Sequence, residues 1–294
     1  MATGLCCREG NVHHALLIDS AVWVPAFAGT TKFGVGSTMG RFASTVGLYE
    51  ALRPPYPAAF FHSVAERLEL SRQHALIDLG TGPGLLALGF APYVGRVVGV
   101  DPEPGMLAAA REAAVRAKVD LTLIEGKVET LPADIGAFDV ITIGRALHWM
   151  DREATLKRFE TLLARDGRIL ICASSTASDG SNPWADAYTA ARRAWSEPRL
   201  WAESGTGNPG RRDPAPFFKD SAFHLAEKIT QLDRHDIHVR DLARRVLTFS
   251  STSPDALGDR VEAMLADVER RLEPFSRDGR ITETFVAVAQ VVTR

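Results

Sequence analysis

The stretch that decides the fold of this chain reads Leu76-Ile77-Asp78-Leu79-Gly80-Thr81-Gly82-Pro83-Gly84. Its apolar residues predict a short buried strand, which leads directly into a turn with glycine at every second position. Glycine adopts positive φ angles and lets the backbone approach a ligand without a Cβ atom in between. Residues 85–93 can then form a helix whose N-terminus faces the same ligand. The stretch therefore predicts a strand, a ligand-binding turn and a helix in succession.

Asp78 lies just before the turn and indicates which kind of ligand the turn accepts. A carboxylate at this place repels a pyrophosphate and attracts a cation, such as an amino group or a sulfonium. The glycines are spaced G-x-G-x-G, whereas the dinucleotide fingerprint is G-x-G-x-x-G. Asp78 therefore favours a cationic ligand, and the glycine spacing argues against a dinucleotide. A nicotinamide-dependent Rossmann oxidoreductase, which has a similar glycine turn, is the alternative from another enzyme class.

Four segments, in the right order, resemble the class I S-adenosylmethionine-dependent methyltransferases. The stretch 76–84 is similar to their motif I, and strand 96–101 ends in Asp101, where the family has an acid that binds both ribose hydroxyls. Residues 138–149 are similar to the fourth strand and the active-site wall, and residues 166–171 to the turn and fifth strand. The spacing of about 20 residues between the turn and Asp101 also suits a ribose site in a doubly wound sheet.

The resemblance implies a Rossmann-like α/β fold: a doubly wound, mainly parallel sheet of seven strands, with an antiparallel last strand and a helical lid inserted after strand five. The alternation of apolar segments agrees, because it is typical of a mainly parallel sheet covered on both faces. We expect strands at 75–79, 96–101, 121–125, 138–143, 168–173, 223–232 and 281–293, and helices at 84–93, 104–118, 151–164, 239–247 and 254–275. Residues 39–294 would form the methyltransferase domain, with the lid at about 174–220.

The resemblance also implies S-adenosylmethionine as the cofactor, bound at the carboxyl ends of the strands. The candidate cofactor-binding residues are Tyr49, Arg53, Asp78, Gly80, Thr81, Gly82, Pro83, Gly84, Asp101, Pro102, Met106, Val128, Glu129 and Arg145. Lys127 stands where the family often has an acid that accepts from the adenine amino group. We therefore expect the Val128 backbone or the Glu129 side chain to make that contact.

Tyr49 and Arg53 belong to the pattern Y-x-x-x-R-P-x-Y-P, which spans residues 49–57. The pattern is similar to the N-terminal lid of a small-molecule subgroup that includes the trans-aconitate methyltransferases, whose lid tyrosine and arginine lie over the cofactor. The alternative interpretation is that the two side chains only pack the entry of the following helix, whose start the prolines fix.

His148 is the candidate catalytic residue. Methyl transfer from a sulfonium is an in-line displacement, so an enzyme achieves much by holding the nucleophile about 3 Å from the methyl group in a dry pocket. An acceptor that carries a proton benefits from a base, and the unperturbed pKa of histidine near 6.5 suits that role. A carboxylate acceptor is already ionised and needs no base. The alternative is that His148 and Trp149 only shape the wall of the site.

The segment 174–220 is rich in Ser, Gly, Pro, Trp and Arg. Its aromatic residues can cover an apolar substrate, and its arginines can pair with a substrate carboxylate. For the arginines we favour the alternative, a solvent-exposed surface, because runs of charge usually face water. The residues concerned are Trp184, Tyr188, Trp195, Trp201, Arg192, Arg193, Arg199, Arg211 and Arg212.

Residues 1–38 show no clear periodicity and precede Met39. We interpret them as a poorly ordered N-terminal extension. The run 23–29 resembles translated bacterial intergenic repeat sequence, so we put forward Met39 as the natural start of the protein.

Composition excludes several other classes. The net charge of -2 and the pI near 6.5 provide no basic field for nucleic acid, and residues 144–147 lack the Asn-Pro-Pro-Tyr type of motif used in base methylation. The three cysteines form no disulfide framework, no residues have metal-ligand spacing, and no stretch reaches the roughly 20 apolar residues of a membrane span. We expect a cytoplasmic enzyme with a small-molecule substrate and no metal, nucleic acid or membrane partner. A non-catalytic S-adenosylmethionine-binding protein is a further alternative.

Overall fold

The computed structural model of the chain describes residues 52–203 and 213–294, and the chain divides into two units, Met1–Gly36 and Ser37–Arg294. Only the second unit contains described residues. Three sets of predicted features lie outside them: the extension at 1–38, the lid residue Tyr49, and the pair Arg211 and Arg212.

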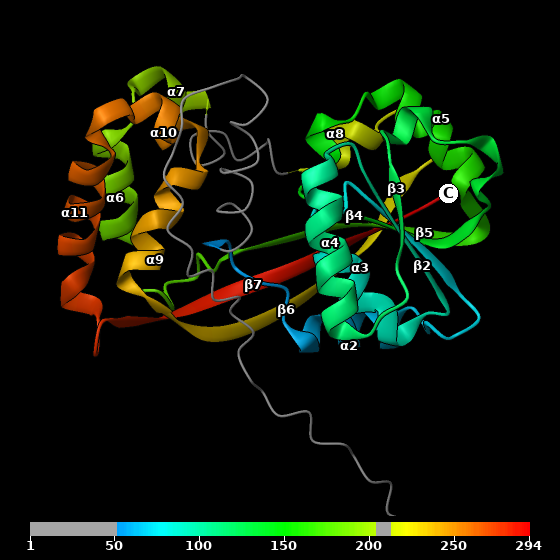
Figure 1. Cartoon of the computed structure of the whole chain (residues 1–294), viewed down its shortest axis with the longest axis horizontal. Helices are drawn as coiled ribbons and strands as arrows, with labels where there is room; N and C mark the ends of the chain where they lie inside the picture. Colours follow the sequence, from blue (N-terminus) through cyan, green and yellow to red (C-terminus); the bar gives the residue numbers. More distant parts are fainter. Residues whose placement is uncertain (1–51, 204–212) are drawn as a thin grey trace, which may run out of the picture. The chain divides into compact units, whose positions relative to one another are not determined.

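One sheet organises the described part of the chain, and its seven strands follow the order β3-β2-β1-β4-β5-β7-β6 (Figure 1). The strands are β1 (Ala75–Leu79), β2 (Arg96–Asp101), β3 (Thr122–Glu125), β4 (Phe138–Gly144), β5 (Leu163–Thr176), β6 (His224–His238) and β7 (Arg280–Thr293). Strands β1 to β5 are parallel, and β7 runs antiparallel to both β5 and β6. This arrangement confirms the predicted fold, including the antiparallel last strand.

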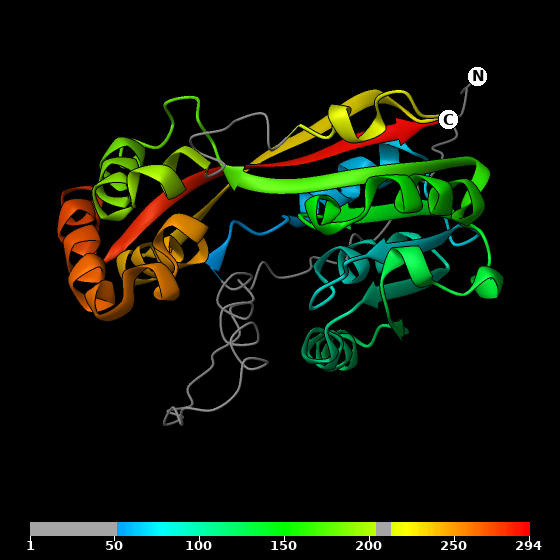
Figure 2. The ribbon, with the colours of Figure 1, turned by 90° about the horizontal axis from the view of Figure 1, so that it is seen from above.

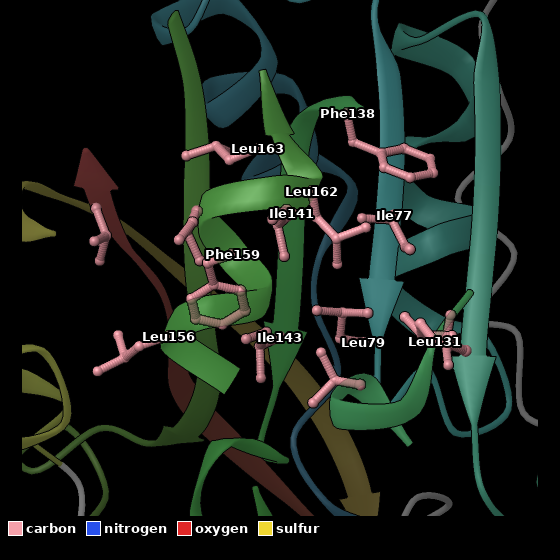
Figure 3. Close-up of a cluster of buried hydrophobic side chains, with 14 of the residues drawn as sticks. Ile77, Leu79, Leu131, Phe138, Ile141, Ile143, Leu156, Phe159, Leu162 and Leu163 are labelled. Carbon is pink, nitrogen blue, oxygen red and sulfur yellow. The ribbon is translucent and has the colours of Figure 1, made fainter. Parts of the chain in front are cut away.

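Successive side chains of a strand point to opposite faces, and on β1 and β4 both faces are apolar and buried. On one face Ile77 and Ile141 pack with Phe159 of α5 (Arg152–Leu162), and all three side chains are fully buried (Figure 3). On the other face Leu76 packs with residues of α2 (Ala58–Arg67) and α3 (Leu85–Phe90). The remaining helices of this part are α4 (Pro104–Ala117) and the short α8 (Ala215–Phe218), whose Phe218 belongs to the same cluster as Phe159. Burial of both faces explains why the strands read as continuous apolar runs.

Strands β5 and β6 are longer than the sequence predicts. Strand β6 continues from the predicted end at 232 to His238, and its pairing with β7 extends to the pair His238 and Arg280. The added residues 233–238 are mostly polar and have low strand propensity. They become a strand because β7 supplies a partner along their whole length, which is tertiary context overriding local preference.

A second group of helices forms around the far ends of β6 and β7, and we call it the cap (Figures 1 and 2). It consists of α6 (Ala185–Trp195), α7 (Pro198–Glu203), α9 (Val239–Arg244), α10 (Pro254–Leu257) and α11 (Val261–Leu272). Its apolar core contains Trp184, Leu242 and Val268. The cap is therefore built from two insertions, one between β5 and β6 and one between β6 and β7, of which the lid predicted at about 174–220 covers only the first.

Candidate functional site

The glycine turn lies at the carboxyl end of β1 and has the backbone that its sequence requires. Gly80, Gly82 and Gly84 have φ angles of 69°, 56° and 88°. A Cβ atom on Gly80 would lie only 2.5 Å from the Cβ atom of Ala146, which follows β4. The turn is tied to β2, because the amides of Gly80 and Thr81 both donate to the carbonyl of Val100 at 2.9 Å. The backbone is thus held where a ligand can reach it closely.

Asp78 is buried beneath this turn, with only 1 % of its surface exposed. The hydroxyl of Thr81 donates to Oδ2 and the hydroxyl of Thr142 donates to Oδ1, each at 2.7 Å. Burial raises the pKa of Asp78 to about 6, although both threonine hydrogen bonds lower it, and the charge of Asp101 adds to the rise. No lysine, arginine or histidine of the described residues forms an ion pair with Asp78. Its negative charge is therefore not neutralised by that part of the chain.

Asp101 closes the second side of the turn from the end of β2. Its Oδ2 accepts from the amide of Gly82 and its Oδ1 accepts from the amide of Glu103, both at 2.9 Å. Each carboxylate oxygen can accept more than one hydrogen bond, so this geometry is compatible with additional ribose hydroxyl donors. Pro102 next to it is exposed, and Met106 at the start of α4 is half-buried.

The loop after β3 meets the same edge of the sheet. The amide of Gly126 donates to the carbonyl of Asp101 at 3.1 Å, which joins the ends of β2 and β3. The side chain of Val128 is buried in the main core, so only its backbone is suited to a ligand contact. Oε1 of Glu129 accepts from the amide of Asp151 at 2.9 Å, which ties this loop to the start of α5.

Arg145, which follows β4, binds a segment that we call the strap, residues 52–56. Its Nη2 donates to the carbonyl of Pro54 at 2.8 Å and to that of Ser174 at 3.3 Å, and its guanidinium lies 5.4 Å from the ring centroid of Tyr56. Arg145 has a φ angle of 59°, in the left-handed region that few non-glycine residues adopt. The structure thus shows the Arg145 guanidinium bound to the strap, a contact that the sequence did not indicate.

The opposite end of the strap is bound to the cap. Nη2 of Arg53 donates to the carbonyl of Thr248 at 3.2 Å, and its guanidinium lies 4.3 Å from the ring centroid of Phe249. The buried Arg245 donates through Nε to the carbonyl of Leu52. The strap therefore connects the cap to the end of β4, beside the glycine turn.

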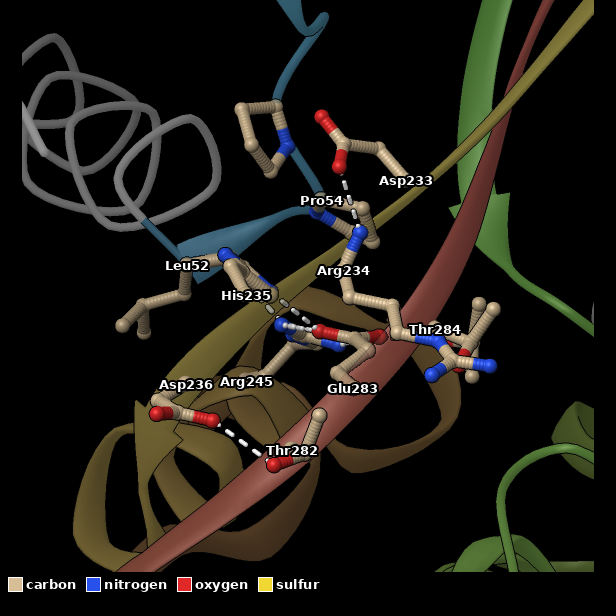
Figure 4. Close-up of polar contacts among 12 residues, drawn as sticks. Leu52, Pro54, Asp233, Arg234, His235, Asp236, Arg245, Thr282, Glu283 and Thr284 are labelled. Atoms are coloured by element: carbon tan, nitrogen blue, oxygen red, sulfur yellow. Dashed lines mark hydrogen bonds and ion pairs between the residues drawn. The ribbon is translucent and has the colours of Figure 1, made fainter. Parts of the chain in front are cut away.

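Glu283 of β7 fixes Arg245 in place (Figure 4). The two groups form a bidentate pair with both N···O distances at 2.7 Å, and the carboxylate also contacts Nε2 of His235 at 2.8 Å and accepts from Thr176 at 2.7 Å. Burial alone would raise the pKa of Glu283. The hydrogen bonds from His235 and Arg245 and the charge of Arg245 outweigh burial and lower the pKa to about 2.

His148 lies on a short 3-10 helix, Leu147–Trp149, after β4. Its side chain is exposed, and its ring centroid lies 4.8 Å from that of Trp149. Trp149 is itself 78 % exposed, the largest exposed fraction among the described large apolar residues. The residue that packs against the glycine turn is Ala146, two positions before His148, so a role of His148 in the site wall stays a prediction.

One interpretation of the cap residues is wrong. Arg192 is not a surface residue: only 4 % of it is exposed, and its guanidinium lies 3.5 Å from the ring centroid of Phe249. Arg193 and Arg199 are exposed, as expected. The residues next to Arg192 do not indicate its burial, because its partner Phe249 lies more than fifty residues further along the chain. Trp184 and Tyr188 pack inside the cap.

Two kinds of site are not found in the part of the chain that the structure describes. No group of three or more metal-ligating side chains occurs among residues 52–203 and 213–294. No helix in these ranges is both long and apolar enough to cross a membrane.

The part of the chain that contains this site is similar to known proteins of one family. The methyltransferase domain family matches residues 77–171, which run from β1 into β5. The chain carries a class I S-adenosylmethionine-dependent methyltransferase domain. The uncharacterized methyltransferase YcgJ of Bacillus subtilis is 33% identical over 105 residues, 35% of this chain and 42% of the relative. Mb3374 of Mycobacterium bovis is 33% identical over 128 residues, 44% of this chain and 49% of that protein. The matches thus span less than half of these relatives.

A solved structure supports the fold of the methyltransferase domain. A candidate type II methyltransferase from Anaeromyxobacter dehalogenans has a TM-score of 0.56 and 18% identity, covering 82% of this chain and 97% of that one. S-adenosylmethionine is the cofactor of this family, and the residues present fit it. The glycine turn leaves no room for a Cβ atom at residue 80, Asp78 is an anion without a protein cation among the described residues, and Asp101 accepts hydrogen bonds beside them.

Proposed function

We propose that this protein transfers a methyl group from S-adenosylmethionine to a small-molecule acceptor by in-line displacement. The observation that carries the proposal is the buried Asp78 carboxylate, which has two hydroxyl donors and no ion-pair partner in the described chain. A buried charge is costly unless an opposite charge or hydrogen bonds compensate it. The hydrogen bonds compensate the Asp78 charge only in part, since burial still raises its pKa to about 6, and a positively charged ligand at the glycine turn would supply the opposite charge.

S-adenosylmethionine, when bound, supplies an activated methyl group on a positively charged sulfur. Asp78 would attract the cationic part of the ligand, and the glycine turn would admit it closely. Asp101 would accept from the ribose hydroxyls, and Met106 and the backbone of Val128 would lie against the adenine. These residues bind and orient, which is the main contribution that a displacement of this kind needs from the protein.

A carboxylate is the acceptor class that we propose first. Support comes from the arginines that the strap and the cap bring together, since Arg53 and Arg192 both lie against Phe249. Arginine is well suited to carboxylate recognition because its planar fork makes two parallel hydrogen bonds. We also propose that His148 serves as the base when an acceptor carries a proton, because its exposed imidazole follows β4. The resemblance of the strap to the lid of trans-aconitate methyltransferases supports the same acceptor class.

Two measurements test this proposal. Calorimetric titration should show binding of S-adenosylhomocysteine and no binding of NADH, and binding of NADH alone would instead support an oxidoreductase. Incubation with a radiolabelled methyl donor and a panel of small carboxylic acids, followed by a metabolite extract, should yield a labelled product together with S-adenosylhomocysteine. Binding without turnover on either acceptor source would support a non-catalytic S-adenosylmethionine-binding protein.

A further inference from the structure

Thr142 is a polar residue of β4 whose neighbours at positions 140, 141 and 143 are buried and apolar. It lies in the middle of β4, is fully buried, and pairs in register with Asp78 of β1. Its hydroxyl donates to Oδ1 of Asp78 at 2.7 Å. A buried hydroxyl costs free energy unless it is hydrogen-bonded, so a valine would be the ordinary residue here. The contact with Asp78 is the physical reason for a threonine at this position.

Each of the two carboxylate oxygens of Asp78 accepts a hydrogen bond from one threonine hydroxyl. Thr142 donates to one oxygen from β4, and Thr81 donates to the other from the glycine turn, both at 2.7 Å. Hydroxyl donors stabilise an ionised carboxylate without neutralising its charge. We propose that Thr142 is a positioning residue of the cofactor site, which together with Thr81 holds the Asp78 carboxylate ionised and oriented for the cation of the cofactor. The inference rests on the proposed function.

Apart from one backbone hydrogen bond, the other groups around Asp78 oppose its ionisation or are neutral. Asp101 of β2 adds a like charge, which raises the pKa of Asp78. The buried thiol of Cys172 on β5 interacts electrostatically with Asp78 and has its own pKa raised by burial and by that carboxylate. A backbone hydrogen bond from Ala87 of α3 lowers the pKa of Asp78. Loss of the Thr142 hydroxyl therefore removes one of the few contacts that favour the charged form.

The test is the pH dependence of S-adenosylhomocysteine binding to the full chain, measured by calorimetry between pH 5 and 8.5. Unaltered protein should lose affinity as the pH falls through about 6, because protonated Asp78 no longer attracts the ligand amino group. In Thr142→Val the loss should begin about one pH unit higher, with affinity roughly 2-fold weaker at pH 7 and close to 10-fold weaker at pH 5. Thr142→Ser keeps the hydroxyl and should restore the original profile.

Two further variants keep the test decisive. Thr81→Val removes the donor to the other oxygen and should shift the profile in the same direction, so the result does not depend on the folding of one variant. Thr155→Val is the matched control, because Thr155 is equally buried and its hydroxyl has no hydrogen-bond partner among the described residues. Its profile should coincide with that of the unaltered chain.

A purely structural role for Thr142 predicts different outcomes. A Thr142→Val profile that coincides with the original, or an affinity loss that is equal at every pH, would overturn the inference and leave the proposed function intact. Failure of the unaltered chain to bind S-adenosylhomocysteine at any pH would instead contradict the proposed function, and the inference with it.

Discussion

Asp78 and Glu283 are both buried carboxylates on strands of one sheet, yet their surroundings differ in kind. Glu283 is saturated by Arg245, His235 and Thr176, and its pKa is lowered to about 2. Asp78 receives only hydroxyl and backbone donors, and burial raises its pKa to about 6. A buried charge that is paired within the chain, such as Glu283, joins segments of the fold. A buried charge that has no protein cation beside it, such as Asp78, is suited to a cationic ligand. Neutralisation of the two carboxylates should therefore change the stability of the fold in opposite directions.

The largest change in stability is expected from substitution of Glu283, the carboxylate that is paired with Arg245. Glu283→Gln leaves the buried Arg245 guanidinium without an opposite charge and should lower the free energy of unfolding by about 3–5 kcal/mol, measured by urea denaturation at pH 7. The double variant Arg245→Met with Glu283→Leu removes both charges and should recover most of that loss. A loss below about 1 kcal/mol in Glu283→Gln would show that the pair does not anchor the cap to the sheet.

Gly80→Ala tests the geometry of the site around the unpaired carboxylate. The alanine would need a φ angle of 69° and would bring its Cβ atom to 2.5 Å from that of Ala146. We expect destabilisation by about 2–4 kcal/mol and loss of S-adenosylhomocysteine binding, from strain and overpacking together. Gly105→Ala is the control, since nothing lies within 4 Å of a Cβ atom there. Equal behaviour of the two variants would contradict the assignment of the turn.

Asp78→Asn should show the opposite sign to Glu283→Gln. The folded-state pKa of about 6 lies above the ordinary value of 3.8, so ionisation of Asp78 lowers the stability of the fold as the pH rises from about 4 to 6. Removal of the charge should therefore leave the unliganded protein as stable at pH 7 or more stable, by up to about 2 kcal/mol. Thermal unfolding at pH 5 and pH 7 checks this, and a destabilisation similar to that of Glu283→Gln would remove the distinction between the two carboxylates.

The smallest effect is expected at the strap, which joins the two regions. Arg145→Ala removes the guanidinium that donates to the carbonyls of Pro54 and Ser174. We expect a loss of about 1 kcal/mol of stability and faster proteolytic cleavage near residues 52–56. Arg193→Ala, at an exposed position in the cap, should stay within about 0.5 kcal/mol of the unaltered chain. Identical cleavage rates in both variants would show that Arg145 does not hold the strap.

The sequence predicted what is encoded locally. The glycine turn, Asp78 before it and Asp101 at the end of the next strand could be placed because their chemistry depends on a few adjacent residues. The mainly parallel sheet with its antiparallel last strand also followed from the pattern of apolar segments together with the family resemblance. Local signals were enough to predict the parallel strands of the sheet and the candidate cofactor-binding residues of the glycine turn, Asp78 and Asp101.

Contacts between distant segments could not be predicted in the same way. The pair Arg245 and Glu283 joins residues 38 positions apart, and the bond from Arg145 to Pro54 spans 91 positions. The sequence around either residue of such a pair does not indicate which distant residue it contacts. Thr142 is different, because a polar residue among the apolar residues at 140–143 is a detectable signal of a buried contact. Its partner became clear only from the register of β1 and β4.

Calorimetric titration of S-adenosylhomocysteine at pH 7.5 into the unaltered chain and into Asp78→Asn tests directly whether Asp78 holds its charge for the cofactor. We expect clear binding to the unaltered chain and affinity weaker by about 10-fold or more in a variant that is at least as stable. Equal affinity in both proteins, or no binding to the unaltered chain, would contradict this role of Asp78.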